Sequence, residues 1–133
     1  MNEWVFYSRG EKILVYEEHL PTDQRSHVVM FRGAPIYREE DLITFPYVKG
    51  FYRSSDFKEV PEEISYLVLN SYAGDGCPSK YTVIKFTATK QVVFEDIGNC
   101  DPVENIELGA KGLKLSFKNN PLIPERKAES RIF

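Results

Sequence analysis

Short runs of β-forming residues, each closed by Gly, Pro, Asn or Asp, recur along this chain of 133 residues and constrain its fold more than any other feature. Such runs at short intervals are typical of strands joined by tight turns. No window carries an apolar stripe at helical spacing over three turns, so we expect at most one short helix, within residues 38–64. The runs lie at Trp4–Arg9, Lys12–Glu17, His27–Arg32, Ser65–Tyr72, Tyr81–Ala88, Gln91–Ile97, Val103–Leu108 and Leu113–Lys118.

The alternation of apolar and polar residues predicts which of these strands are buried on one face and which on both. Leu113, Leu115 and Phe117 share one face, as a half-buried strand requires. Residues 65–72 and 81–88 carry apolar side chains on both faces, which places both strands inside a sheet. Residues 13–16 are all apolar, so we expect that strand to be covered on both sides as well.

The predicted strands follow one another closely, and this spacing favours antiparallel neighbours over crossover connections. We therefore predict an all-β, mainly antiparallel fold, either a meander-type sandwich or a small open barrel. Residues 1–118 are expected to form a single β-rich domain, with an irregular excursion over residues 38–64. Residues 119–133 contain Pro121 and Pro124 and are expected to form an extended C-terminal tail.

The composition supports a folded domain with a mildly acidic surface. Apolar residues make up 42 % of the chain, enough to build a core. The net charge is −3, from 17 basic and 20 acidic residues, which argues against a dedicated nucleic-acid-binding protein. No stretch approaches the roughly 18 apolar residues of a membrane span. The residues after Met1 have neither a basic nor an apolar segment of the kind that directs export.

The two cysteines, Cys77 and Cys100, are placed to meet. If residues 81–88 and 91–97 form a hairpin turning at residues 89–90, both cysteines arrive at its open end. A disulfide is then feasible, provided that the Cα atoms come within about 7 Å. It would stabilise the fold by about 3 kcal/mol. A reducing compartment would instead keep two buried thiols, and redox or metal chemistry is a further alternative.

Catalysis has few candidate residues. His19 and His27 are the only histidines, and Glu17 and Glu18 precede His19. A carboxylate-steered histidine would be a general base for a small hydrolase, but a solvated loop after residue 19 is the simpler interpretation. The spacing of the histidines matches no metal-binding pattern. We therefore expect no catalytic residue, no metal and no cofactor.

One aromatic segment, Tyr47–Arg53, interleaves rings with Lys49 and Arg53 in the way that some base-stacking surfaces do. The alternative is that the rings fill the core. We prefer the core because the net charge is negative.

One segment resembles a known pattern. Residues 67–81, with Gly74, Gly76 and Cys77-Pro78, are followed by Ile97-Gly98-Asn99-Cys100. This arrangement is similar to small bacterial proteins, many of them exported, in which the two cysteines pair. The resemblance spans residues 65–118 and implies a structural role for the cysteines and glycines.

The small size, the acidity and the β-rich plan also resemble bacterial immunity proteins of contact-dependent growth inhibition or type VI secretion. The resemblance implies a non-enzymatic protein that covers the active site of a cognate toxin, for instance a cationic nuclease. Carboxylates in loops would then steer association with a cationic site. The candidates for partner binding are Glu39, Glu40, Asp41, Glu62, Glu63, Asp75 and Asp101.

The cellular compartment that we expect differs between the two candidate functions. An immunity protein against a nuclease would be cytoplasmic. The alternative is a periplasmic or exported envelope protein, stabilised by its disulfide, with a small-ligand-binding or structural role.

Overall fold

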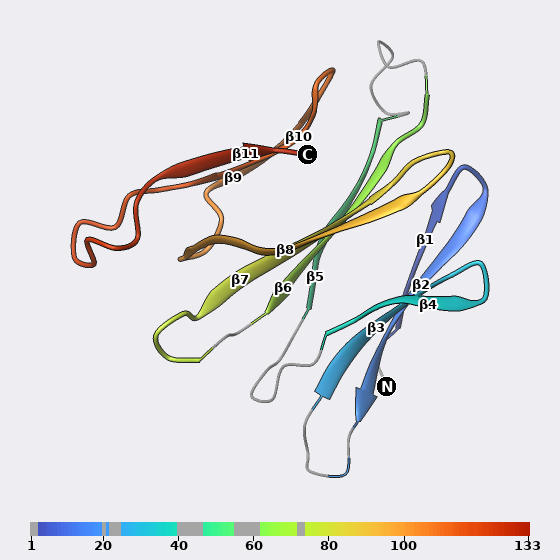
Figure 1. The fold of residues 1–133 in the computed structure, drawn as a ribbon, viewed down its shortest axis with the longest axis horizontal. Coiled ribbons are helices and arrows are strands. Elements are labelled where there is room, and N and C mark those ends of the chain that lie inside the picture. The colour runs from blue at the N-terminus through green and yellow to red at the C-terminus, as the bar shows by residue number, and fades with distance from the viewer. Residues whose placement is uncertain (1–2, 20, 22–24, 40–46, 55–61, 72–73) are drawn as a thin grey trace.

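The structure is a computed structural model that describes residues 3–19, 21, 25–39, 47–54, 62–71 and 74–133 (Figure 1). Every helix or strand given for these residues is a strand, so the predicted all-β class is confirmed. The strands are β1 (Glu3–Ser8), β2 (Glu11–His19), β3 (Arg25–Phe31), β4 (Ala34–Arg38), β5 (Tyr47–Arg53), β6 (Ser65–Ser71), β7 (Ser79–Phe86), β8 (Gln91–Cys100), β9 (Asn105–Gly109), β10 (Gly112–Phe117) and β11 (Glu129–Ile132).

The strands form three antiparallel sheets, and each sheet is built from strands that are consecutive in the sequence. The N-terminal sheet has the order β1-β2-β3-β4, the middle sheet β5-β6-β7-β8, and the C-terminal sheet β11-β10-β9. Each sheet is therefore a simple meander joined by short turns, as the spacing of the runs predicts.

The three sheets stack as layers, with the middle sheet covered on both faces (Figure 1). One core lies between the N-terminal and middle sheets, where the Phe31 and Phe86 rings meet edge to face at 5.2 Å. A second core lies between the middle and C-terminal sheets, where Tyr81 packs on Phe117 at 5.6 Å. The meander-type sandwich thus has three layers, and none of its sheets closes into a barrel in the described part of the chain.

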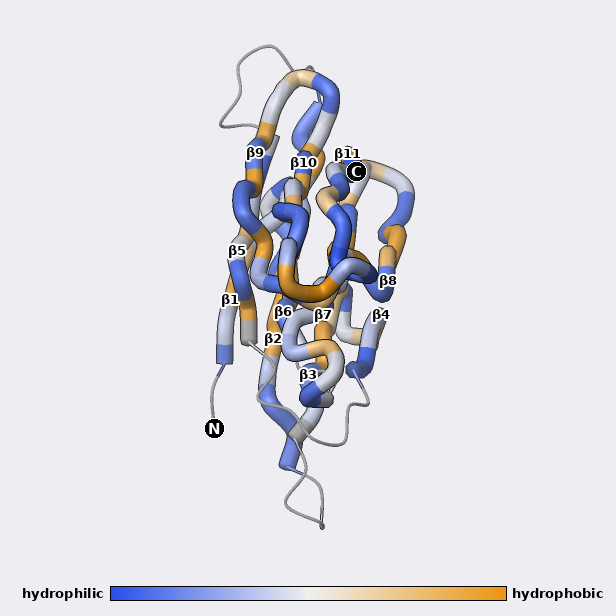
Figure 2. The backbone as a smooth tube through the Cα atoms, turned by 90° about the vertical axis from the view of Figure 1, so that its left-hand side faces the viewer, coloured by the Kyte–Doolittle hydropathy of each residue, from blue (hydrophilic) through white to orange (hydrophobic). Residues whose placement is uncertain are grey.

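The middle strands confirm the prediction made from their two apolar faces. Residues 65–70 of β6 are all buried, and β6 lies between β5 and β7. Alternate residues of β6 point into opposite cores, Leu67 toward the N-terminal sheet and Val68 toward the C-terminal sheet. Figure 2 shows apolar and polar residues alternating along the strands.

The expectation that β2 is covered on both sides is wrong. Ile13 and Val15 are fully buried against the middle sheet, but Leu14 and Tyr16 on the other face are only half-buried. That face is the outside of the N-terminal sheet. The four consecutive apolar residues of β2 therefore alternate between a face buried in the core and a face that is partly exposed.

One strand, β5, lies in the region 38–64 that we expected to be irregular. Residues 47–53 form β5, in which the strand pairing shifts between Val48 and Gly50. A Cβ atom at Gly50 would lie 2.6 Å from the Tyr52 hydroxyl, so the ring folds back over the glycine. Phe51 stacks on Phe6 at 4.7 Å, and Tyr52 packs against the second core. These two rings fill the cores, as we preferred over base stacking.

The last residues are part of the C-terminal sheet. Residues 129–132 form β11, paired with β10, where we expected only an extended tail. Phe133 is buried, and its carbonyl oxygen accepts a 2.9 Å hydrogen bond from the Tyr66 hydroxyl. A Cβ atom at Gly112 would lie 2.2 Å from that oxygen, so only glycine fits there.

Candidate functional site

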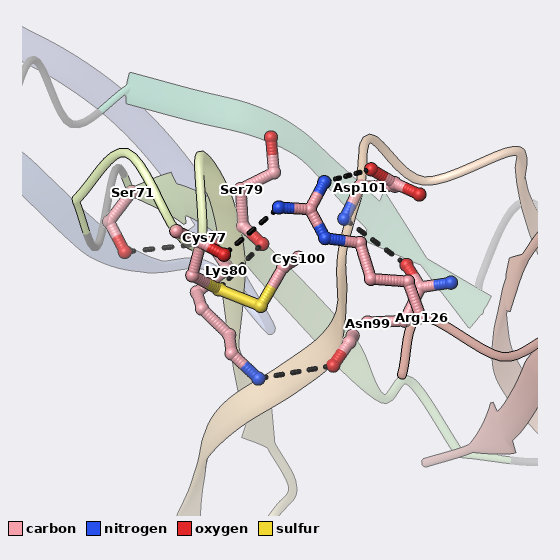
Figure 3. The surroundings of a disulfide bond; sticks show 10 residues. Ser71, Cys77, Ser79, Lys80, Asn99, Cys100, Asp101 and Arg126 are labelled. Carbon is pink, nitrogen blue, oxygen red and sulfur yellow. Dashed lines mark hydrogen bonds and ion pairs between the residues drawn. A yellow bond between two sulfur atoms is a disulfide. The ribbon is translucent and has the colours of Figure 1, made fainter. Parts of the chain in front are cut away.

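A disulfide between Cys77 and Cys100 lies where β7 and β8 meet the C-terminal loop (Figure 3). The Cα atoms are 4.5 Å apart, within bonding reach, and the predicted pairing is confirmed. The hairpin turn closes between Thr87 and Lys90, one residue earlier than predicted. Two irregularities along β8 then shift the pairing so that Ser79 lies opposite Cys100.

The irregular end of β8 depends on Gly98. Its φ of 110° is a conformation that side chains rarely adopt, and Asp96 and Cys100 beside it also have positive φ. A Cβ atom at Gly98 would lie 2.9 Å from the Phe117 ring. Glycine is therefore required for the close packing of β8 on the Phe117 ring, two residues before Cys100.

The disulfide is one part of a larger brace that holds the C-terminal loop, residues 119–127. The Arg126 guanidinium donates hydrogen bonds to the Asp101 carboxylate at 2.7 Å and to the carbonyl oxygen of Gly76 at 2.9 Å (Figure 3). The Asn120 amide donates to the second oxygen of Asp101 at 3.0 Å. The Arg126 and Asp101 side chains are only 13 % and 23 % exposed, so solvent screens this ion pair little.

Asn99 and the loop's own backbone complete the brace. The Asn99 side-chain amide donates to the carbonyl oxygens of Lys118, at 2.7 Å, and Lys127, at 3.0 Å, which lie at the two ends of the loop. The Asn120 backbone N–H donates to the carbonyl of Arg126 at 2.8 Å, which closes the loop on itself. The loop is therefore tied at both ends and across its middle.

Leu122 projects from this braced loop. Its side chain is 89 % exposed, the highest value among the large exposed apolar residues of the described chain. The next residue, Ile123, lines a hollow of about 460 Å³, whose wall carries charges of both signs, including Lys80, Glu125 and Lys127. The site can therefore present one apolar side chain, at a fixed position, to the surface of a partner.

The carboxylates that we proposed for partner binding do not form one patch in the described part of the chain. Glu39 is buried beside His27. Glu62 is exposed, and the Glu63 carboxylate accepts a hydrogen bond from the backbone N–H of Arg9.

Asp75 and Asp101 lie at the opposite end of β6 from Glu62 and Glu63. Asp75 is exposed, and Asp101 is engaged by Arg126 and Asn120. Seven residues of β6 separate the two pairs, a span of roughly 20 Å in a strand. Glu40 and Asp41 lie outside the described residues.

The two histidines have different surroundings. His27 is fully buried, directly opposite Glu17 across β2 and β3, with its Nδ1 3.8 Å from the Glu39 carboxylate and its ring at 5.4 Å from Trp4. Burial lowers the pKa of His27 to about 4, against the opposing effect of Glu17, so the ring is neutral at pH 7. His19 lies exposed at the end of β2.

Four residues of the braced site were not predicted from the sequence: Asn99, Asn120, Leu122 and Arg126. Of the site's side chains only Asp101 and the two cysteines were predicted. The available signal was the cluster of turn-forming residues at 119–121, which marks a loop but not its contacts.

Comparison of this chain with protein-family models, with curated proteins and with solved structures finds no match. Among the described residues, no three or more His, Cys, Asp and Glu side chains are grouped to bind a metal ion. The same part of the chain contains no helix long and apolar enough to cross a bilayer.

Proposed function

We propose that this chain is a non-enzymatic binding protein that neutralises a cognate bacterial toxin by covering its active site, and that it docks through the C-terminal loop. The observation that carries the proposal is the 89 % exposed Leu122 on a loop that the disulfide, Asn99 and the Arg126–Asp101 pair hold in place. Transfer of this large apolar side chain from water into a pocket of a partner would be favourable.

A braced loop favours tight binding because little conformational freedom remains to be lost when the partner docks. Anchors of this kind contribute most of the binding free energy when they enter a pocket that excludes water. Glu125 and Lys127, which line the hollow, follow Leu122 in the same loop and would form part of the polar rim of the interface.

The dispersed carboxylates change the kind of partner that we propose. A cationic nuclease would be matched by acidic residues on one face, but Glu63 and Asp75 lie at opposite ends of β6. We therefore propose a toxin whose active-site cleft has an apolar pocket that accepts a leucine side chain.

The Cys77–Cys100 disulfide favours an oxidising compartment such as the periplasm. The toxin would then act in the cell envelope rather than on cytoplasmic nucleic acid. The same bond favours the second candidate, an exported envelope protein with a small-ligand-binding or structural role.

The test is a competition between sister cells of the native host. A strain without this gene should be outcompeted by its parent, and the gene restored in its original form should rescue it. Leu122→Glu should fail to rescue. Ile132→Glu is the matched control, since Ile132 is a 53 % exposed aliphatic residue on the outer face of β11, and it should rescue fully.

A strain without the gene that competes equally with its parent would contradict the immunity function. Rescue by Leu122→Glu would contradict the proposed loop. A weakened envelope in the deleted strain when it is grown alone would favour the second candidate.

A further inference from the structure

The outer face of the N-terminal sheet carries a row of apolar side chains that crosses all four strands. Val5 of β1 lies opposite Leu14 of β2, Leu14 opposite Met30 of β3, and Met30 opposite Pro35 of β4. Val5 is 44 % exposed, Pro35 is exposed, and Leu14 and Met30 are half-buried. A hollow of about 400 Å³ lies over Leu14 and Met30.

The C-terminal sheet shows what a solvent-facing outer layer looks like in the same chain. Its outer face has the row Asn105, Ser116 and Ser130, one residue from each strand. The Ser130 and Ser116 hydroxyls lie 3.3 Å apart in a hydrogen bond. This row of the C-terminal sheet is polar across its width, although the next row ends in exposed Ile132, whereas the row from Val5 to Pro35 is apolar, and burial of an apolar row is favourable.

Charges flank the apolar row in a self-complementary way. In the next row, Glu3 of β1 lies opposite Tyr16, Tyr16 opposite Val28, and Val28 opposite Arg38 of β4. This row has an acidic residue at one edge of the sheet and a basic residue at the other, where Arg38 also pairs with Glu18 of the same chain; Val28 in the middle of the row is fully buried. A two-fold axis parallel to the strands, between β2 and β3, places β1 of one copy over β4 of the other.

We propose that a second copy of this chain covers this face, related by that two-fold axis. Glu3 of each copy then lies over Arg38 of the other, so opposite charges meet at both edges of the interface. The apolar rows face each other, with Leu14 of one copy against Met30 of its partner. Because the interface is symmetric, every favourable contact occurs twice.

The same rotation brings an exposed ring to the hollow. Tyr7, 53 % exposed at the β1 edge, lies over the Arg32–Gly33 turn of the other copy, which forms one wall of the hollow. A tyrosine side chain fills such a space with little loss of conformational freedom.

The face is small. Four strands about 4.8 Å apart and about six residues long give an area of roughly 20 Å by 20 Å. The two copies together would bury roughly 800 Å², which is below the range of stable complexes and typical of weak, transient ones, so we expect a dimer that dissociates at tens to hundreds of micromolar.

The test is sedimentation equilibrium of the full chain over about three decades of concentration, centred on about 100 micromolar. The average mass should rise from 15.4 kDa toward twice that value. Val5→Glu should weaken dimerisation at least tenfold, whereas the matched Ile132→Glu on the other outer sheet should leave it unchanged. Circular dichroism should show that both variants remain folded.

A charge-reversal mixture tests the axis itself. Glu3→Lys alone puts like charges at both edges of the dimer, and so does Arg38→Glu alone. In a mixture, a heterodimer of the two variants pairs opposite charges at both edges. The mixture should therefore associate more tightly than either variant by itself, and the difference should shrink as salt is added.

A chain that stays monomeric at the highest concentration overturns the proposal. A dimer that Val5→Glu and Glu3→Lys leave intact overturns the proposed face, and a mixture no tighter than its components overturns the proposed axis. Loss of sister-cell protection in a monomeric Val5→Glu variant would mean that the toxin, rather than a second copy, covers this face.

Discussion

Buried His27 makes the stability of this protein depend on pH. In the unfolded chain its imidazole binds a proton below the ordinary pKa of 6.5, but in the folded protein burial lowers that pKa to about 4. Between these values the unfolded state binds more protons, so stability is fully present above pH 6.5 and is lost as the pH falls.

The size of this effect follows from the shift. At 1.36 kcal/mol for each pKa unit, the total loss is about 3 kcal/mol, reached below pH 4. About 2 kcal/mol of it should be lost between pH 7 and pH 5, before most carboxylates begin to protonate. Urea unfolding at pH 7, 6 and 5 measures this loss as a falling midpoint.

Two variants isolate the contribution of His27. His27→Leu removes the titrating group from the core and should flatten the stability profile between pH 7 and pH 5, whatever its effect at pH 7. His19→Gln alters the exposed histidine and should leave the slope of the original protein. Equal slopes in His27→Leu and the original protein would refute the assignment of this loss to His27.

Three further outcomes test the packing. Replacing Cys77 and Cys100 by serine should lower the free energy of unfolding by about 3 kcal/mol, because the bond closes a loop over a sequence separation of 23 residues; reduction of the original protein should have the same effect, and no change would contradict it. Gly98→Ala should cost about 2 kcal/mol, since its φ is positive and a ring lies 2.9 Å from the added Cβ. Gly76→Ala, with no atom within 4 Å, should be nearly neutral, and similar losses for the two would count against this account. Tyr66→Phe should cost about 1 kcal/mol by removing a buried hydrogen bond, measured by urea unfolding, and an unchanged midpoint would show that the hydroxyl contributes little.

The strands that could be predicted from the sequence are those whose buried side chains form an uninterrupted pattern. The two apolar faces of β6 and β7 indicate strands inside a sheet, which is where the structure has them. The alternation in β10 likewise predicts its single buried face. Side chains of a strand point alternately to its two faces, so burial of a face places apolar residues at every second position of the sequence.

Two strands, β5 and β11, escaped prediction for different reasons. All four residues of β11 are exposed, so no apolar alternation marks this strand, which is held mainly by its pairing with β10. In β5, Gly50 interrupts the run where the pairing shifts. Glycine there indicates a loop from sequence alone, although the close approach of the Tyr52 ring is what requires it.

The candidate site was predictable only in its covalent part. A hairpin brings Cys77 and Cys100 together at its open end. The predicted pairing therefore holds even though the turn lies one residue earlier than predicted. The contacts of Arg126 and Asn99 join segments 19 to 50 residues apart in the sequence. Such contacts follow from the stacking of the sheets, which local patterns do not encode.

The stacking of three consecutive meanders also sets the order in which the protein can be completed during synthesis. The N-terminal sheet leaves the ribosome first, but its inner face has no cover until residues 65–86 emerge. The far side of the middle sheet then waits for residues 113–133. A nascent chain therefore exposes an apolar face of the middle sheet until residues 113–133 have been made, and in this interval binding of a chaperone would prevent aggregation.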